Sequence, residues 1–209
     1  MKPKIHKNYY DVVILPPPKI RDYLISLSQQ LYKYDSKWIL GKRSYLPHLS
    51  LYHIPVKLKA FPVFIEELKT LLKNTQPGNL KLGDGALYLR YSSIILNTDK
   101  PTWLRKLYLN IIKNTQKYRD PDFDQNKAWT YERLPLGMKN NLNKYGTPMV
   151  GQYFIPHFTL SQYYTNYKIQ EGFRGLKFNK YSFKPDYLYV CELALGHTCQ
   201  KIIEKIPFE

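Results

Sequence analysis

A six-residue pattern occurs twice in this sequence and limits what the chain can fold into. Residues 46–51 read LPHLSL and residues 155–160 read IPHFTL. Each copy is thus an apolar residue, a proline, a histidine, an apolar residue, a hydroxyl residue and a leucine. Polar and apolar residues alternate after the proline, which is typical of a strand with one face in a core. The chain therefore has to build two similar half-buried strands from distant segments.

The alternation also predicts which side chains lie together. Successive side chains of a strand point to opposite faces, so His48 and Ser50 share one face of the first strand. His157 and Thr159 share one face of the second in the same way. Each strand thus presents an imidazole and a hydroxyl together, while its other face packs into a core. An imidazole exchanges a proton near neutral pH, and a hydroxyl can donate a hydrogen bond to an anion.

The composition indicates a folded, basic protein. The chain has 209 residues, 44% of them apolar, and a formal net charge of +16 that is spread along its length. A chain of this length and apolar content can bury a sizeable core without disulfide or metal staples. A folded body with this charge favours a polyanionic partner, and nucleic acid is the first candidate. The 20 tyrosines add aromatic faces on which bases stack.

The pattern of apolar residues predicts a mixture of strands and helices in one domain over residues 1–209. Strands are predicted at 10–15, 46–54, 155–161, 174–183 and 187–195, with two more inside 80–96. Helices are predicted at 19–34, around 64–72 and from 101 onward. Residues 118–152 are polar and rich in Pro, Gly and Asn, which indicates an irregular connection. Because several strands are hairpin neighbours, an α+β fold with largely antiparallel sheets follows.

The paired segments resemble the His-x-Ser/Thr-x signature of the two-histidine (2H) phosphoesterases. That superfamily includes bacterial 2′-5′ RNA ligases, cyclic-nucleotide phosphodiesterases and RNA-end trimming enzymes. The resemblance implies two pseudo-symmetric α+β lobes of largely antiparallel sheet, with flanking helices, around a central cleft. One motif, at 48–51 or 157–160, would come from each lobe. It further implies that His48 and His157 are the catalytic pair and that Ser50 and Thr159 hold a phosphate oxygen.

The chemistry of the residues agrees with that implication. Cleavage of a phosphodiester beside a 2′-hydroxyl needs one base and one acid, and histidine serves as either. We expect a phosphodiesterase that uses no metal and no cofactor and acts on a 2′,3′-cyclic phosphate or a 2′-5′ linkage in RNA or a nucleotide. Two alternatives remain: a hydrolase of cyclic oligonucleotide signals, and a non-catalytic RNA-binding protein with a basic cleft.

Six further residues are candidates for binding the substrate. Continued alternation would place Tyr52 beside Ser50, and Ser161 and Tyr163 beside Thr159. Three basic residues are candidates for contacts with phosphate: Lys42 and Arg43 before the first motif, and Arg90 in a predicted strand. The same alternation turns His53 away from His48, so we interpret His53 as structural.

The remaining expectations concern the setting of the protein. No apolar run reaches the roughly 20 residues that a membrane-spanning helix needs, so no membrane association is expected. No secretory signal is recognised. Cys191 and Cys199, the only cysteines, do not form a disulfide framework or a zinc pattern. A cytoplasmic protein follows as the expectation, and a monomer rather than an obligate oligomer.

Overall fold

The computed structural model describes residues 5–124, 129, 132, 134–164, 167–194 and 197–209. Its strands form one eight-stranded antiparallel sheet in the order β6-β3-β4-β5-β2-β1-β7-β8. The strands are β1 (Ile5–Ile14), β2 (Leu49–Pro55), β3 (Leu80–Tyr88), β4 (Ser93–Thr98), β5 (His157–Gln162), β6 (Ser182–Phe183), β7 (Tyr187–Ala194) and β8 (Thr198–Pro207). The described α-helices are α1 (Pro18–Tyr32), α2 (Phe61–Leu72), α3 (Thr102–Thr115), α5 (Leu136–Tyr145) and α6 (Tyr167–Arg174).

The sheet consists of two halves that meet at one point. One half is β2-β1-β7-β8 and the other is β6-β3-β4-β5. The strands β2 and β5 join them through a single registered pair, Leu49 opposite Phe158. Both residues are fully buried. The two motif strands are therefore central neighbours in the sheet, although they are far apart in the sequence.

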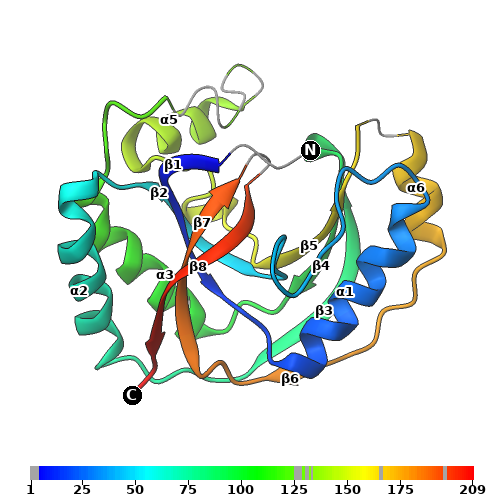
Figure 1. The fold of residues 1–209 in the computed structure, drawn as a ribbon, viewed down its shortest axis with the longest axis horizontal. Coiled ribbons are helices and arrows are strands. Elements are labelled where there is room, and N and C mark those ends of the chain that lie inside the picture. Colours follow the sequence, from blue (N-terminus) through cyan, green and yellow to red (C-terminus); the bar gives the residue numbers. More distant parts are fainter. Residues whose placement is uncertain (1–4, 125–128, 130–131, 133, 165–166, 195–196) are drawn as a thin grey trace.

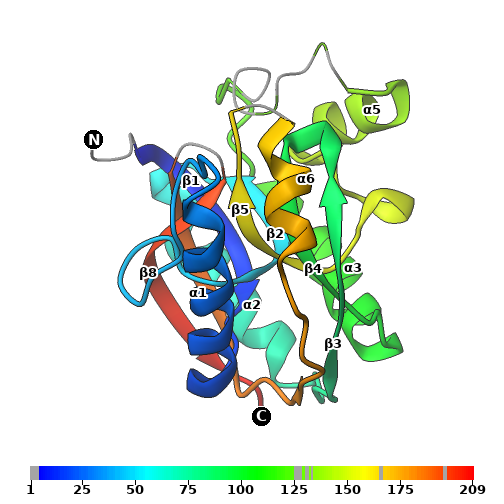
Figure 2. The same cartoon turned by 90° about the vertical axis from the view of Figure 1, so that its right-hand side faces the viewer.

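Helices cover the two halves separately. The helices α1 and α6 lie side by side against the half that contains β3, β4 and β5 (Figures 1 and 2). The helices α2 and α3 pack against β8 and β2 of the other half. Each of α1, α2 and α3 turns a stripe of buried apolar residues toward the sheet, which is the pattern that predicted these helices. The α+β fold with largely antiparallel strands is confirmed.

Three local predictions were wrong. The connection over 118–152 contains a regular helix, α5, which follows Pro135 and ends at Gly146 with φ of 80°. Only Met138 and Leu142 of α5 are buried, so its periodicity is weak. The strand predicted at 174–183 is reduced to the two residues of β6.

The third error is the omission of β8. Lys201, Glu204 and Lys205 interrupt its apolar pattern, as is common in a strand at the edge of a sheet. None of the helices in the described ranges is both apolar enough and long enough to cross a bilayer.

Candidate active site

A β-bulge in the first motif strand decides which side chains share a face. Ser50 of β2 pairs with Val13 of β1, but Tyr52 pairs with Val12, so Leu51 is an extra residue. Beyond the bulge the alternation is inverted, and His53, opposite Asp11, returns to the face of Ser50. The prediction that His53 points away from His48 is therefore wrong.

Tyr52 is also displaced by this bulge. It turns to the other face, where its side chain is 1% exposed. Its hydroxyl donates to the carbonyl of Tyr145 at 2.6 Å. The prediction that Tyr52 shares the face of Ser50 is therefore wrong, although Tyr52 is among the residues that line the pocket described below.

The second motif strand carries a bulge at the same place. Thr159 pairs with Ile95 of β4 and Ser161 with Ile94, so Leu160 is the extra residue. Gln162, opposite Ser93, consequently shares the face of His157 and Thr159.

Ser161 and Tyr163 are thereby turned into the core, and their predicted places beside Thr159 are wrong. Ser161 is fully buried and donates from Oγ to Ser36 Oγ at 2.6 Å. Tyr163 is 1% exposed and packs in the main hydrophobic core.

The four motif side chains line one pocket. This motif pocket encloses about 1000 Å³, its open mouth included. Its wall contains His48, Ser50, His157 and Thr159, which come from both halves of the sheet. Other lining residues are Trp38, Tyr45, His53, Tyr88, Tyr91, Trp129, Gln162 and His197. The junction of β2 and β5 therefore brings the two predicted imidazole–hydroxyl pairs to a common space.

Both motif histidines are oriented by the backbone in the same way. Nδ1 of His48 lies 2.7 Å from the carbonyl oxygen of Leu46, and Nδ1 of His157 lies 2.6 Å from that of Ile155. A carbonyl oxygen only accepts, so Nδ1 carries the proton and donates it. In the neutral ring Nε2 then holds a lone pair, and in the charged ring it holds a proton. Each histidine can thus act at Nε2 as a base or as an acid.

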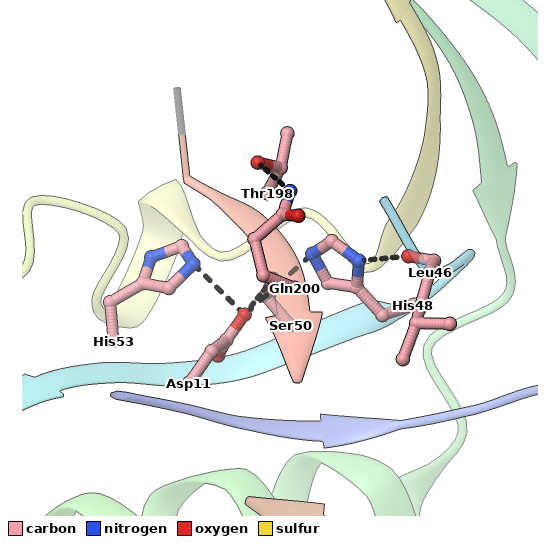
Figure 3. Close-up of polar contacts among 7 residues, drawn as sticks. All are labelled: Asp11, Leu46, His48, Ser50, His53, Thr198 and Gln200. Atoms are coloured by element: carbon pink, nitrogen blue, oxygen red, sulfur yellow. Dashed lines mark hydrogen bonds and ion pairs between the residues drawn. The ribbon is translucent and has the colours of Figure 1, made fainter. Parts of the chain in front are cut away.

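A buried carboxylate lies next to the side chains of the first motif. Asp11 of β1 is fully buried. Its Oδ2 accepts a hydrogen bond from Ser50 Oγ at 2.6 Å and lies 3.0 Å from Nε2 of His53 (Figure 3). The same oxygen lies 3.8 Å from Nε2 of His48, which is an ion-pair distance and not a hydrogen bond. Asp11 therefore links three side chains of the pocket wall.

Burial lowers the pKa of both motif histidines. At His48, desolvation lowers the pKa below its ordinary value of 6.5, and the Asp11 carboxylate is the strongest opposing influence. At His157, desolvation again lowers the pKa, and the carbonyl of Ile155 is the strongest opposing influence. A lowered pKa keeps a large fraction of each imidazole neutral near pH 7, as a general base requires.

Two of the three predicted basic contacts, Lys42 and Arg43, are not among the described residues that line the pocket. Lys42 and Arg43 are exposed, and Lys42 forms an ion pair with Asp22 of α1 at 2.9 Å. Arg90 is in the short helix Leu89–Tyr91, and its side chain lies outside the described part of the chain. Among the described lining residues there is no Lys, Arg, Asp or Glu.

Aromatic rings form much of the described pocket wall. Trp38 and Tyr45 are nearly parallel, with ring centroids 5.9 Å apart and an interplanar angle of 12°. Trp129 stacks on His197 at 3.9 Å. Flat apolar faces of this kind accept nucleobases by stacking.

Sequence reasoning missed Asp11, His53, Gln162 and His197 at this site. Asp11 alone had a signal, because it is an acidic residue within the apolar run of residues 9–15. His53 and Gln162 lie beyond the bulges, and His197 is brought to the pocket by the turn before β8.

Comparison with known proteins gives a likeness at the level of structure. No family model and no curated protein matches the sequence. Among solved structures, TT0787 of Thermus thermophilus aligns with a TM-score of 0.62 and 11% identity, over 96% of this chain and 97% of that one. LigT of E. coli complexed with phosphate aligns with a TM-score of 0.54 and 13% identity, over 100% and 99%.

These likenesses extend over the whole chain. LigT, of the 2′-5′ RNA ligase family, also aligns in its complex with 3′-AMP, with a TM-score of 0.54 and 12% identity. That alignment covers 98% of this chain and 96% of LigT. The chain thus has the LigT-like fold, the fold that the resemblance to the two-histidine phosphoesterases predicted.

Proposed function

We propose that the protein is a phosphodiesterase that acts on a 2′,3′-cyclic phosphate or a 2′-5′ linkage in RNA or a nucleotide. One observation carries this proposal. Two imidazoles line the same pocket, each has Nδ1 fixed on a backbone carbonyl, and each is followed two residues later by a hydroxyl that lines the same pocket. A base and an acid are thereby available on one phosphodiester.

The reaction balances with these groups alone. Nε2 of one neutral histidine takes the proton of the nucleophile as its oxygen bonds to phosphorus; the nucleophile is water on a 2′,3′-cyclic phosphate, and water or the neighbouring 3′-hydroxyl on a 2′-5′ linkage. Nε2 of the other, protonated histidine gives its proton to the leaving ribose oxygen as the P–O bond breaks. Donors in the pocket wall stabilise the charge that develops on the non-bridging oxygens. The two histidines then exchange protonation states with solvent, and the scheme uses no metal.

Two observations support a nucleotide as the substrate. LigT, which has this fold, binds phosphate and 3′-AMP in its solved complexes. The aromatic faces of the motif pocket suit a nucleobase, and its described wall has no cationic side chain for a long polyanion. We therefore favour the end of an RNA molecule, or a short nucleotide, as the ligand of this pocket over the interior of a long RNA chain.

A substrate panel tests the proposal. Wild-type protein is incubated with a 2′,3′-cyclic nucleotide, 2′-5′ oligoadenylate, a cyclic dinucleotide and RNA with a cyclic end, with and without EDTA. We expect turnover of the first, second or fourth substrate, unaffected by EDTA. The variants His48→Ala and His157→Ala should each lose about 10²- to 10⁴-fold in turnover. Lys42→Ala, outside the pocket, is the control and should retain activity.

Other outcomes would redirect the proposal. Turnover of the cyclic dinucleotide alone would favour the hydrolase of cyclic signals. Loss of activity in EDTA, restored by metal, would contradict the metal-free scheme. A wild type that turns over nothing, with RNA binding unchanged in both histidine variants, would favour the binding protein.

A further inference from the structure

The two halves of the site are built on one plan, but two polar positions beyond the motif hydroxyls carry different chemical groups in the two halves. Ser50 pairs with Val13 as Thr159 pairs with Ile95, and each motif strand has its bulge at the next residue. Counting from these pairs, Asp11 and His53 of the first half correspond to Ser93 and Gln162 of the second. The first half therefore has a carboxylate and an imidazole where the second half has a hydroxyl and an amide.

Because of this difference, the two motif hydroxyls have different hydrogen-bonding roles. Ser50 donates its hydrogen to Asp11 Oδ2 at 2.6 Å, so that hydrogen is not available to a phosphate oxygen. Thr159 Oγ1 makes no hydrogen bond with the described residues and lines the pocket. In the second half, Ser93 donates to the carbonyl of Tyr91 at 2.9 Å. Thr159 is thus the motif hydroxyl whose hydrogen can reach a bound phosphate.

Because of the same difference, the two motif histidines have different electrostatic surroundings. Asp11 Oδ2 lies 3.8 Å from Nε2 of His48, and its other oxygen is buried without a hydrogen-bond partner among the described residues. A buried carboxylate requires positive charge or donors nearby. Neutral His48 offers none at Nε2, because its proton is on Nδ1, whereas protonated His48 offers a charge and a proton there. The position of Asp11 in the second half holds the neutral Ser93, so no such carboxylate stands behind His157.

We propose that Asp11 sets the direction of catalysis: it favours protonation of His48 over protonation of His157, so that His48 acts as the general acid and His157 as the general base, and it leaves Thr159 to bind the phosphate. The inference rests on the proposed function and deepens it. Asp11 is a positioning residue, since it acts through His48 and Ser50.

The charged and titratable groups around His48 agree with this direction. Asp11 of β1 favours the protonated ring, whereas His53 of β2 opposes it when charged. At His157 of β5, both other histidines oppose protonation and Asp11 is the weakest of the influences on its pKa. In the reaction, His157 Nε2 takes the proton of the nucleophile, and His48 Nε2 gives its proton to the leaving oxygen.

A change of leaving group distinguishes the acid from the base. The substrate that the wild type turns over is compared with an analogue whose leaving oxygen is replaced by sulfur, because a thiolate leaves without a proton. We expect the defect of His48→Ala, about 10²- to 10⁴-fold on the oxygen substrate, to shrink below about tenfold on the analogue. The defect of His157→Ala should stay unchanged. Rescue of His157→Ala, or of neither variant, would overturn the assignment, whereas a wild type inactive on both substrates would defeat the proposed function itself.

The pH profile tests Asp11 directly. Asp11→Asn removes the charge at nearly constant shape, so the alkaline limb of the bell-shaped profile, which reports the acid, should move to lower pH. The acidic limb should stay. Asp84→Asn, which removes an exposed carboxylate paired with Lys180, is the matched control. A profile that falls in amplitude without movement of either limb, in a variant that melts like the wild type, would show a merely structural Asp11.

The two hydroxyls provide a test that leaves Asp11 intact. Inorganic phosphate serves as a competitive inhibitor of the wild type, of Thr159→Ala and of Ser50→Ala. Thr159→Ala should weaken phosphate binding about 10- to 100-fold, the effect of losing a hydrogen bond to a charged group. Ser50→Ala should mainly lower kcat, because it acts through Asp11 and His48. Equal losses of phosphate affinity in both variants would contradict the division of roles.

Discussion

Phe158 connects the fold to the chemistry, and its replacement by alanine gives a quantitative test. It lies between the two motif residues His157 and Thr159, on the opposite face of β5, and is fully buried. It pairs with Leu96 in its own half and with Leu49 across the junction. Removal of a buried phenyl ring costs about 3–5 kcal/mol of the free energy of unfolding. For a chain of this size, that corresponds to a fall in Tm of about 6–20 °C.

The same change should disturb catalysis without touching a reacting group. A cavity at the junction lets the two motif strands shift relative to each other, and a displacement of about 1 Å costs about 100-fold in rate. Thermal unfolding followed by circular dichroism, and turnover measured well below the lowered Tm, separate the two effects. Leu136→Ala, which truncates a residue that is 74% exposed, is the control and should change stability by less than about 0.5 kcal/mol. A Phe158→Ala variant with wild-type stability and rate would refute the role of the junction.

Three further predictions concern pH, thiols and salt. Because the pKa values of His48 and His157 are lowered by burial, the unfolded chain binds more protons below about pH 6.5, so the free energy of unfolding should fall from pH 7.5 to 5.5. The double variant with both rings replaced should show a flatter pH dependence in the same melts, and an equally steep one would contradict this cause. Cys191 and Cys199 are buried, and burial raises the pKa of Cys199, so a thiol reagent should label neither until urea is added; labelling of the native protein within minutes would count against this. Finally, the affinity for a mononucleotide should change by less than about tenfold between 50 and 200 mM salt, because the described pocket wall has no Lys or Arg; a steep decline would place basic side chains at the ligand.

The sequence pattern predicted the site up to the bulges and no further. His48 and Ser50, like His157 and Thr159, lie within two residues of one another, so local alternation sufficed to place them together. The inverted faces of Tyr52 and His53 depend on the register between β1 and β2, and those of Ser161 and Gln162 on the register between β4 and β5. Register is a property of two strands, and the pattern of one strand does not contain it.

The same distinction explains the fold. The helices α1, α2 and α3 were predicted because each buries a stripe of apolar residues against the sheet. The edge strand β8 and the helix α5 bury few side chains. Most of their positions face solvent and can be polar, so the spacing of their apolar residues gives only a weak signal. The sequence pattern also could not predict that the sheet continues through Leu49 and Phe158, because that contact joins residues from separate halves.

The attachment of each reactive ring to a main-chain oxygen has a consequence for how such a protein can vary. The oxygens that orient the rings belong to Leu46 and Ile155, and every amino acid supplies that same atom. Replacements at these two positions therefore alter packing but retain the acceptor. The orientation of the two Nε2 atoms is therefore robust to mutation at these positions. The residues of the surrounding pocket wall can change during evolution to fit other ligands while this orientation is kept.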